Sequence, residues 1–312
     1  MSDTSLHSEN RTLTAFAVVI GTVLLFALGE VLTKYLTTRY PVELIMVIRS
    51  VVSLILIMAF VWPKLGRNLW KINRTRWVFL RGLILVIASL SIGHALRLMP
   101  VGETISILYS FPIIVMIMSI PLMGEQVSAI NWGFATLGFA GVLMVARPGG
   151  DLETLGVTFA LLTALLAATL HLMTRVLTKT ETSHALLFYS ILISVPCSGL
   201  LALLTWEGYF PNMMDLGLIA LLGIIINAAH YLFAVAYRYA PASLIAPANW
   251  VHVVWAALFS WLFFDHLPDQ WTFLGMVVIV AAGVGIAIKT HRENSNRPTG
   301  TSVSQDLRRT KI

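Results

Sequence analysis

The stretches ALRLMP at 95–100 and AYRYAP at 236–241 share the pattern Ala-x-Arg-x-x-Pro at an offset of 141 residues. Each follows a long apolar run and precedes another one. The same offset relates Thr33-Lys34 to Thr174-Arg175, Ser53 to Ser194, and Glu125 to His266; after one gap, Gly133 and Gly141 align with Gly275 and Gly283. The sequence therefore contains an internal duplication slightly shorter than half the chain.

The composition indicates that the apolar runs cross a lipid bilayer. Of the 312 residues, 57% are hydrophobic and 12% are charged, and the mean hydropathy is +0.82, whereas soluble domains carry about 25% charged residues. About 20 apolar residues span the hydrocarbon core as a helix, because each residue rises about 1.5 Å. Runs of that length predict an all-α membrane protein with ten transmembrane helices, near residues 14–36, 43–62, 77–96, 101–122, 129–146, 154–175, 184–204, 215–236, 242–264 and 269–289.

The segments outside these spans are too short to form a soluble domain. We predict a cytoplasmic tail at 1–13, a first five-helix repeat at 14–147, a second at 154–289, and a disordered basic tail at 290–312. The first span is too long for a signal peptide and no small-residue cleavage site follows it, so we expect it to stay as a membrane helix. The single Cys197 excludes an intrachain disulfide.

Lysine and arginine are distributed unevenly between the two sides of the predicted membrane. If the N-terminus is cytoplasmic, fourteen of these residues lie in segments on that side, and three, Arg39, Arg97 and Arg147, lie on the other. The positive-inside rule then places both termini in the cytoplasm, in a bacterial inner membrane. The net charge of +6 is thus a topology signal, also compatible with contact to anionic lipid, and we expect no nucleic-acid partner.

Because each copy has five spans, an odd number, the second copy enters the membrane from the opposite side. Arg97 and Arg238 then lie on opposite faces of the bilayer. Inverted repeats build two similar bundles with a binding site between them and two mirror-related open states. The duplication therefore predicts two inverted five-helix repeats around a central cavity.

Two stretches also resemble a known family. RGLILVIASLSIGHALRLMPVGETISILYSFPIIVMIMSIPLMGE at 81–125 is similar to the third and fourth helices of an EamA repeat. AAHYLFAVAYRYAPASLIAPANWVHVVWAALFSWLFFDHLPDQWTFLGMVVIVAAGVGIA at 228–287 is similar to the eighth to tenth helices, although His266 replaces the usual Glu. The resemblance, over about 14–289, is to ten-helix EamA-type members of the drug/metabolite transporter superfamily. It implies secondary transport of small organic metabolites, commonly export, with peripheral fifth and tenth helices.

Charged side chains inside the apolar spans are candidates for function, because each costs about 2.5–3.5 kcal/mol at a helix centre on insertion scales. Lys34, Arg81 and Arg175 lie near span ends, where snorkelling explains them, and Arg49 fits structural pairing and cavity lining equally well. Glu30 either pairs with Lys34 at i+4 or faces the cavity. Its repeat counterpart is His171, so these two residues could carry a coupled proton.

Other polar groups cluster beside prolines or are spread over several spans. Pro112 and Pro247 are expected to kink the fourth and ninth spans. Small residues at Gly133, Gly138, Gly141, Ala281 and Gly285 are expected to allow close helix packing. The predicted substrate-binding residues are Glu30, His94, Tyr109, Ser110, His171, Asn227, His230, Asn249, Trp250 and His252.

The main hypothesis is a secondary transporter with an alternating-access mechanism. No Walker A sequence is present, so we expect no ATP hydrolysis, no cofactor and no bound metal. A membrane-embedded enzyme with a metal or His/Glu site is the alternative, and a channel is less well supported. The expected partners are the lipid bilayer and a small-molecule substrate, such as an amino acid or derivative, a vitamin or a nucleoside-like solute. We favour export as the direction and include a homodimer among the expected partners, while the coupling ion is left open.

Overall fold

The computed structural model of the chain describes residues 3–123, 128–146, 152–206, 208, 210–239 and 251–295. All regular secondary structure in this part of the chain is helical. Eight helical segments there are long and apolar enough to cross a membrane, and two shorter apolar helices, Val251–Phe264 and Gln270–Gly285, complete the predicted ten. The prediction of an all-α membrane protein is confirmed.

The helices follow the predicted spans closely, and two spans, 43–62 and 101–122, are each divided into more than one element. The element bounds are α1 Asp3–Thr37, α2 Val42–Leu56, the π-helical turn η1 Ile57–Val61, α3 Trp62–Leu65, the 3-10 turn η2 Gly66–Trp70, α4 Thr75–Leu98, α5 Val101–Leu108, α6 Phe111–Met123, α7 Ala129–Ala146, α8 Thr154–Leu177, α9 Ser183–Leu204, α10 Met213–Tyr239, α12 Val251–Phe264 and α13 Gln270–Ser295. At the two ends, α1 begins ahead of its predicted span and α13 continues past its own.

Proline explains where the fourth span breaks. Helix α5 ends at Leu108 and α6 begins at Phe111, directly before Pro112. Proline has no N–H to donate and its ring clashes with the preceding turn, so the helix is interrupted there. The predicted kink at Pro112 is confirmed, while Pro247, the proline expected to kink the ninth span, lies outside the described residues.

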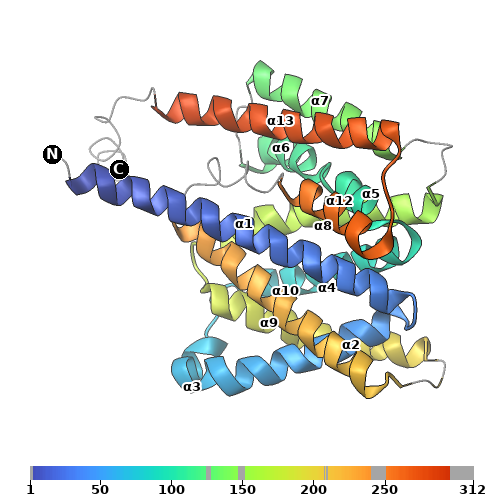
Figure 1. Ribbon diagram of the computed structural model, residues 1–312. Helices are drawn as coiled ribbons and strands as arrows, with labels where there is room; N and C mark the ends of the chain where they lie inside the picture. Colours follow the sequence, from blue (N-terminus) through green and yellow to red (C-terminus); the bar gives the residue numbers. More distant parts are fainter. Residues whose placement is uncertain are drawn as a thin grey trace.

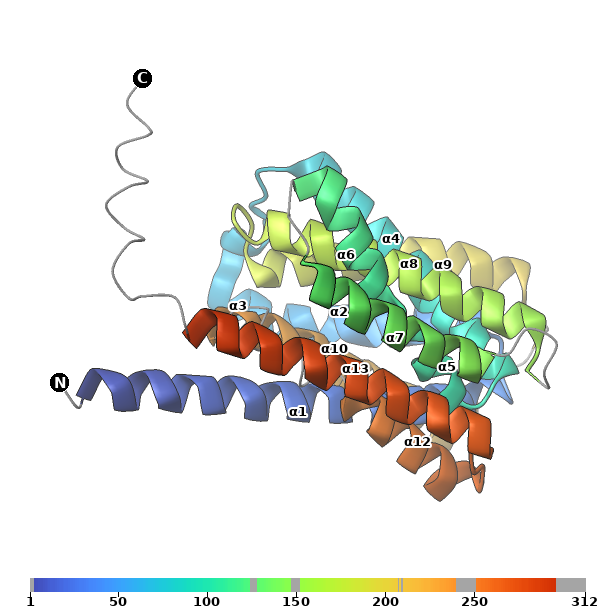
Figure 2. The same ribbon diagram turned by 90° about the horizontal axis from the view of Figure 1, so that it is seen from above.

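The helix pairs follow the two-fold relation of the duplication. Helix α1 packs on α10 and α12, and its counterpart α8 packs on α4, α5 and α6. Helices α2 and α9, which are each other's counterparts, pack together, as do α7 and α13. Figures 1 and 2 show α7 and α13 side by side, and Figure 1 places them at one edge of the bundle, as the resemblance implied. The start of α1 and the end of α13 lie at the same end, as an even number of spans requires.

Small residues bring α7 and α13 close together. A Cβ atom added at Gly141 would lie 2.7 Å from the carbonyl oxygen of Gly275, and one added at Gly275 would lie 2.7 Å from that of Gly141. The packing role expected for Gly141 is confirmed. The expected packing role is wrong for Gly133, because no atom lies within 4 Å of a Cβ atom built there. It is also wrong for Ala281, which is exposed.

Candidate functional site

A small cavity lies between the two repeats. It has a volume of about 40 Å³ and is walled by α2 and α4 from the first repeat and by α9 and α10 from the second. Binding sites for organic ligands commonly measure about 300–1,000 Å³, so this space holds a few water molecules and no metabolite. Its polar lining residues are Arg49, Ser50, Ser53, Ser89, Ser190, Ser194, Asn227 and His230.

The lining residues occur as repeat counterparts. Offsets of 141 residues relate Arg49 to Ser190, Ser50 to Ile191, Ser53 to Ser194, Leu85 to Ile226, Val86 to Asn227, and Ser89 to His230. All of these side chains border the same space, so the cavity lies on the approximate two-fold axis. The chemistry of the two halves differs, because Arg49 in the first repeat corresponds to Ser190 in the second, and Val86 corresponds to Asn227.

Hydrogen bonds link the two repeats across this cavity. Ser50 Oγ and Ser194 Oγ are 2.8 Å apart. The Asn227 side-chain amide donates to Ser53 Oγ, and also to the Gly223 carbonyl oxygen at 2.6 Å. Ser53 and Ser194 were visible in the sequence as a repeat match, and the same offset applied to Asn227 and His230 would have found Val86 and Ser89.

Arg81 does not snorkel toward the end of its span. Its Nε donates to Thr174 Oγ1 and its Nη1 to Ser190 Oγ, each at 2.9 Å, so it links α4 to α8 and α9. The snorkelling interpretation is wrong here, because polar groups of the opposite repeat are within reach. Arg49, for which pairing and lining were equally expected, lines the cavity.

Glu30 pairs with a residue other than the one that helix spacing suggested. Its Oε2 lies 3.0 Å from Nε2 of His252 on α12, and both side chains are buried. The interpretation that Glu30 pairs with Lys34 is wrong, because the Lys34 ammonium group donates to the carbonyl oxygens of Arg97 and Met99 at 3.3 and 3.0 Å.

The Glu30–His252 contact has a counterpart in the other repeat. His171 corresponds to Glu30, and Phe111 corresponds to His252, at the same offset. The rings of His171 and Phe111 stack with centroids 4.9 Å apart. At equivalent positions, one contact is therefore a hydrogen-bonded carboxylate–imidazole pair, Glu30 with His252, and the other is a pair of stacked rings, His171 with Phe111.

The other predicted site residues lie in several places. His94 Nε2 is 3.0 Å from Glu43 Oε1, where α4 meets α2, rather than in the cavity. Tyr109 is buried in an apolar cluster, with its ring 5.9 Å from that of His252. Ser110 is buried beside it, and its hydroxyl has no hydrogen-bond partner among the described residues. Asn227 and His230 line the cavity, and Asn249 and Trp250 lie outside the described residues.

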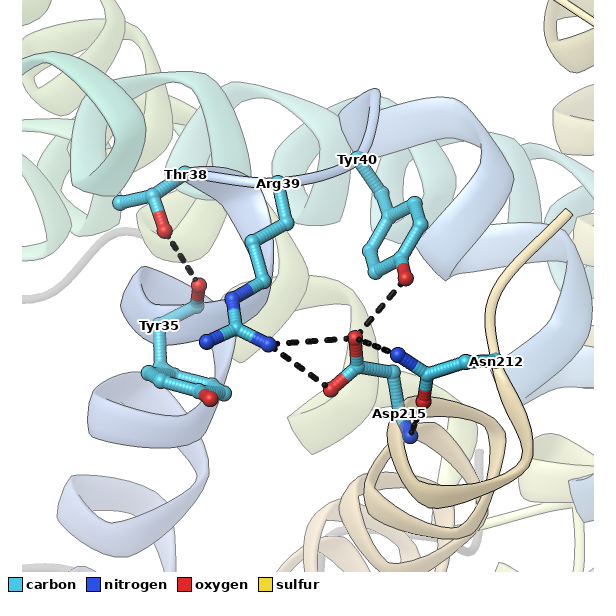
Figure 3. Close-up of polar contacts among 6 residues, drawn as sticks. All are labelled: Tyr35, Thr38, Arg39, Tyr40, Asn212 and Asp215. Carbon is cyan, nitrogen blue, oxygen red and sulfur yellow. Dashed lines mark hydrogen bonds and ion pairs between the residues drawn. The ribbon is translucent and has the colours of Figure 1, made fainter. Parts of the chain in front are cut away.

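One end of the bundle is joined by a cluster that we name the Asp215 cluster, formed by Arg39, Tyr40, Asn212 and Asp215 (Figure 3). The Asp215 carboxylate at the start of α10 accepts from the Tyr40 hydroxyl at 2.8 Å and from Arg39 at 3.3 Å. The Arg39 guanidinium also lies 4.5 Å from the centre of the Tyr35 ring. The hydrogen bond to Asp215 raises the pKa of Tyr40. A cavity of about 60 Å³ beside Arg39 and Tyr40 has mainly apolar walls.

The opposite end is joined by a cluster that we name the Glu181 cluster, formed by Asn73, Arg74, Thr180 and Glu181. The buried Glu181 carboxylate, between α8 and α9, accepts from the backbone N–H groups of Asn73 at 3.0 Å and Arg74 at 2.9 Å. Asn73 also donates its side-chain amide to the Thr180 carbonyl at 2.9 Å. By the offset of 141, Glu181 corresponds to Tyr40 and Arg74 to Asp215. The two clusters are therefore repeat counterparts at opposite ends.

Within the described residues, no three histidine, cysteine or acidic side chains gather closely enough to hold a metal ion. The pairs Glu30–His252, Glu43–His94 and Glu103–His266 each bring one carboxylate to one imidazole. Each pair thus supplies two groups, whereas metal sites in proteins usually use three or four such ligands.

Comparison with known proteins gives consistent results. The family described as the EamA-like transporter family matches residues 13–147 and 154–288. An S-adenosylmethionine uptake transporter of Rickettsia bellii (strain RML369-C) is 25% identical over 292 residues, covering 92% of this chain and 99% of the relative. A riboflavin transporter of Rhizobium johnstonii is 26% identical over 191 residues, covering 61% and 63%.

Two further similarities concern an exporter and a solved structure. A pseudopaline exporter of Pseudomonas aeruginosa is 21% identical over 269 residues, covering 84% of this chain and 92% of the relative. A crystal structure of a protein superposes with a TM-score of 0.68 at 18% identity, covering 90% of this chain and 98% of that one. At that identity, the superposition shows a common fold.

Proposed function

Because the chain belongs to the EamA-like transporter family, we propose that it is a secondary transporter that moves a small organic metabolite by alternating access between its repeats. The named relatives are transporters of S-adenosylmethionine, riboflavin and pseudopaline. The chain is accordingly a small-metabolite transporter, and the alternative of a membrane-embedded enzyme is wrong. We propose an amino-acid derivative, a vitamin or a nucleoside-like solute as its substrate, the classes that the sequence suggested.

The cavity on the two-fold axis is the observation that carries this proposal. A site used from both sides of a membrane must be reachable from both repeats, and inverted repeats place such a site at their interface. The polar walls of the cavity come from two helices of each repeat, at equivalent positions. Asn227, His230 and Arg49 are the lining residues that we propose for substrate contact.

The two end clusters support the alternating step. The Asp215 cluster joins the α1–α2 connection to α10, and the Glu181 cluster joins the α8–α9 connection to the start of α4. With both clusters formed, the cavity is too small for a metabolite. We propose that one cluster opens while the other stays formed, so that the cavity widens toward one side of the membrane at a time.

The location and direction are also proposals. We propose a bacterial inner membrane with both termini in the cytoplasm, supported by the lysine and arginine distribution and by the bacterial relatives. Export stays a prediction, because the relatives include an uptake transporter and an exporter. Homodimer formation stays a prediction as well.

Purified protein in liposomes tests the proposed function. The liposomes are loaded with a bacterial metabolite extract supplemented with S-adenosylmethionine and riboflavin, and efflux and uptake are followed by mass spectrometry. We expect at least one small solute to cross saturably, at a rate well above that of protein-free liposomes. Equal fluxes with and without correctly folded protein, for every solute and in both directions, would contradict the proposal.

A further inference from the structure

Arg49 presents a positive charge to the cavity without a negatively charged partner in the described part of the chain. It lies seven residues into α2, about 10 Å along the helix at about 1.5 Å per residue. Its one hydrogen bond there is from Nη2 to the Met46 thioether sulfur at 3.0 Å, and a thioether is a weak acceptor. Most of its five N–H donors are therefore available to another group.

The backbone of α10 holds Arg49 in this position. A Cβ atom built on Gly223 would lie 3.2 Å from the Arg49 carbonyl oxygen and 3.3 Å from its Cγ. Glycine at position 223 thus lets α10 pack against the stem of Arg49. Arg49 lines the cavity together with Ser53 and Asn227.

Arg81 adds a second positive charge at the edge of the cavity. It donates to Thr174 and Ser190, and Ser190 is itself a lining residue. These acceptors are neutral hydroxyl groups, so they satisfy hydrogen bonds and leave the charge uncompensated. Neither Arg49 nor Arg81 has a carboxylate within 4.0 Å among the described residues.

The acidic residues of the spans are bound elsewhere. Glu30, Glu43 and Glu103 are each paired with a histidine, at 3.0, 3.0 and 2.8 Å respectively. Arg39, in contrast, forms an ion pair with Asp215 at the end of the bundle. The protein therefore neutralises an arginine at its end and leaves two positive charges beside its central cavity, where uncompensated charge is costly.

We infer that Arg49, assisted by Arg81, binds a carboxylate group of the transported solute. This inference rests on the proposed function and names the substrate class, an organic acid or zwitterion. A guanidinium fork matches a planar carboxylate through two parallel hydrogen bonds. Two donors of Arg81 are already used by Thr174 and Ser190. Arg49 is therefore the residue whose guanidinium group binds the solute carboxylate directly. Asn227 and His230 then contact the polar remainder of the solute.

Transport by wild type and Arg49→Gln in liposomes tests this inference. The probes are the bacterial metabolite extract and two matched pairs, S-adenosylmethionine with its decarboxylated analogue, and L-tryptophan with L-tryptophanamide. We expect every solute carried by wild type to bear a carboxylate, and any analogue without it to be carried at least tenfold more slowly. Arg49→Gln should lower transport of these solutes at least thirtyfold, and Arg49→Lys should lower it less, because the charge is kept and the fork is lost.

Arg76→Gln is the matched control, because Arg76 lies on the same helix as Arg81 and is exposed. Its transport should equal that of wild type. The melting temperature of solute-free Arg49→Gln separates binding from structure: we expect it to equal or exceed the wild-type value, since an uncompensated charge is removed. Wild-type transport by Arg49→Gln, transport of an analogue without the carboxylate at the rate of its parent solute, or a lowered melting temperature would overturn the inference. A wild-type protein that carries no solute contradicts the proposed function itself.

Discussion

The two ends of the bundle are joined at equivalent positions by different chemistry. In the Asp215 cluster, a buried carboxylate accepts from a tyrosine hydroxyl and a half-exposed arginine (Figure 3). In the Glu181 cluster, a buried carboxylate accepts from two backbone N–H groups. The carboxylate has also changed places, because Glu181 corresponds to Tyr40 and Arg74 to Asp215. The duplication has therefore kept the contact between the segments, while the residues that make it have diverged.

This difference implies that the two ends open with different free energies. The Asp215 cluster contains an ion pair and charge-assisted hydrogen bonds, and removing its charge abolishes the ion pair and weakens the hydrogen bonds. The acceptors of the Glu181 cluster can be replaced by a neutral amide oxygen that still accepts from the backbone. Equivalent substitutions at the two ends should thus affect the protein unequally.

The largest expected effect concerns the contact between Glu30 on α1 and His252 on α12. Glu30→Gln keeps the size and the hydrogen bond but removes the titrating proton. We predict that it abolishes the acceleration of transport by a pH gradient, while exchange of solute across the membrane continues. Transport in liposomes with and without an imposed gradient measures this.

Glu43→Gln is the matched control for Glu30→Gln, because Glu43, in the first turn of α2, makes the same kind of carboxylate–histidine contact at 3.0 Å, with His94. It should leave the response to the gradient unchanged. If Glu30→Gln retained the wild-type response, Glu30 would have no part in coupling.

At the Asp215 cluster, Asp215→Asn should be clearly destabilising. The substitution removes the ion pair with Arg39 and weakens the bond from Tyr40. Lost hydrogen bonds to a buried charged group cost about 1.5–3 kcal/mol, so the melting temperature in detergent should fall by several degrees. Asp265→Asn, at an exposed position, is the control and should melt like wild type. An unchanged melting temperature in Asp215→Asn would mean that the cluster does not hold this end.

At the Glu181 cluster, Glu181→Gln should have a smaller effect. A glutamine oxygen can still accept from the N–H groups of Asn73 and Arg74, and the charge assistance alone is lost. Charge-assisted hydrogen bonds are about twice as strong as neutral ones, so the cost is about 1 kcal/mol. A drop in melting temperature larger than that of Asp215→Asn would reverse our comparison of the two ends.

The smallest expected effect is a dependence of stability on alkaline pH. The pKa of Tyr40 is raised, chiefly by its hydrogen bond to Asp215, so the folded state favours the protonated phenol. This stabilisation is complete below the unfolded pKa of about 10 and is lost as pH rises through the higher folded value. Between about pH 9 and 11, the melting temperature of Tyr40→Phe should therefore fall less than the melting temperature of wild type. Parallel curves for the two proteins would contradict this.

Much of the fold could be predicted from the sequence, because apolar runs report membrane spans directly. The break before Pro112 and the close approach at Gly141 followed from local rules for proline and glycine. The start of α1 at Asp3 did not, because the first helix continues through polar residues. Span prediction measures hydropathy, and a helix can extend beyond the apolar part.

The candidate site could be predicted less well, because side-chain partners depend on which helices meet. Spacing along one helix suggested that Glu30 pairs with Lys34, whereas its partner is His252 on a distant span. Arg81 was expected to snorkel, although α8 and α9 supply hydroxyl groups within reach. The repeat offset, applied to every polar position and not only to Ser53 and Ser194, would have paired Ser89 with His230, which both line the cavity.

Accessibility of the cavity from each side tests the central claim most directly. In a Cys197→Ser background, Ser89→Cys places a thiol at the cavity wall, and a membrane-impermeant thiol reagent is applied to either side. We predict that Asp215→Asn increases labelling from the side on which Asp215 lies, by about fivefold or more, as about 1 kcal/mol or more of bias allows. Glu181→Gln should increase labelling from the opposite side. Increased labelling from the same side in both variants, or no change in either, would contradict alternating access between the two clusters.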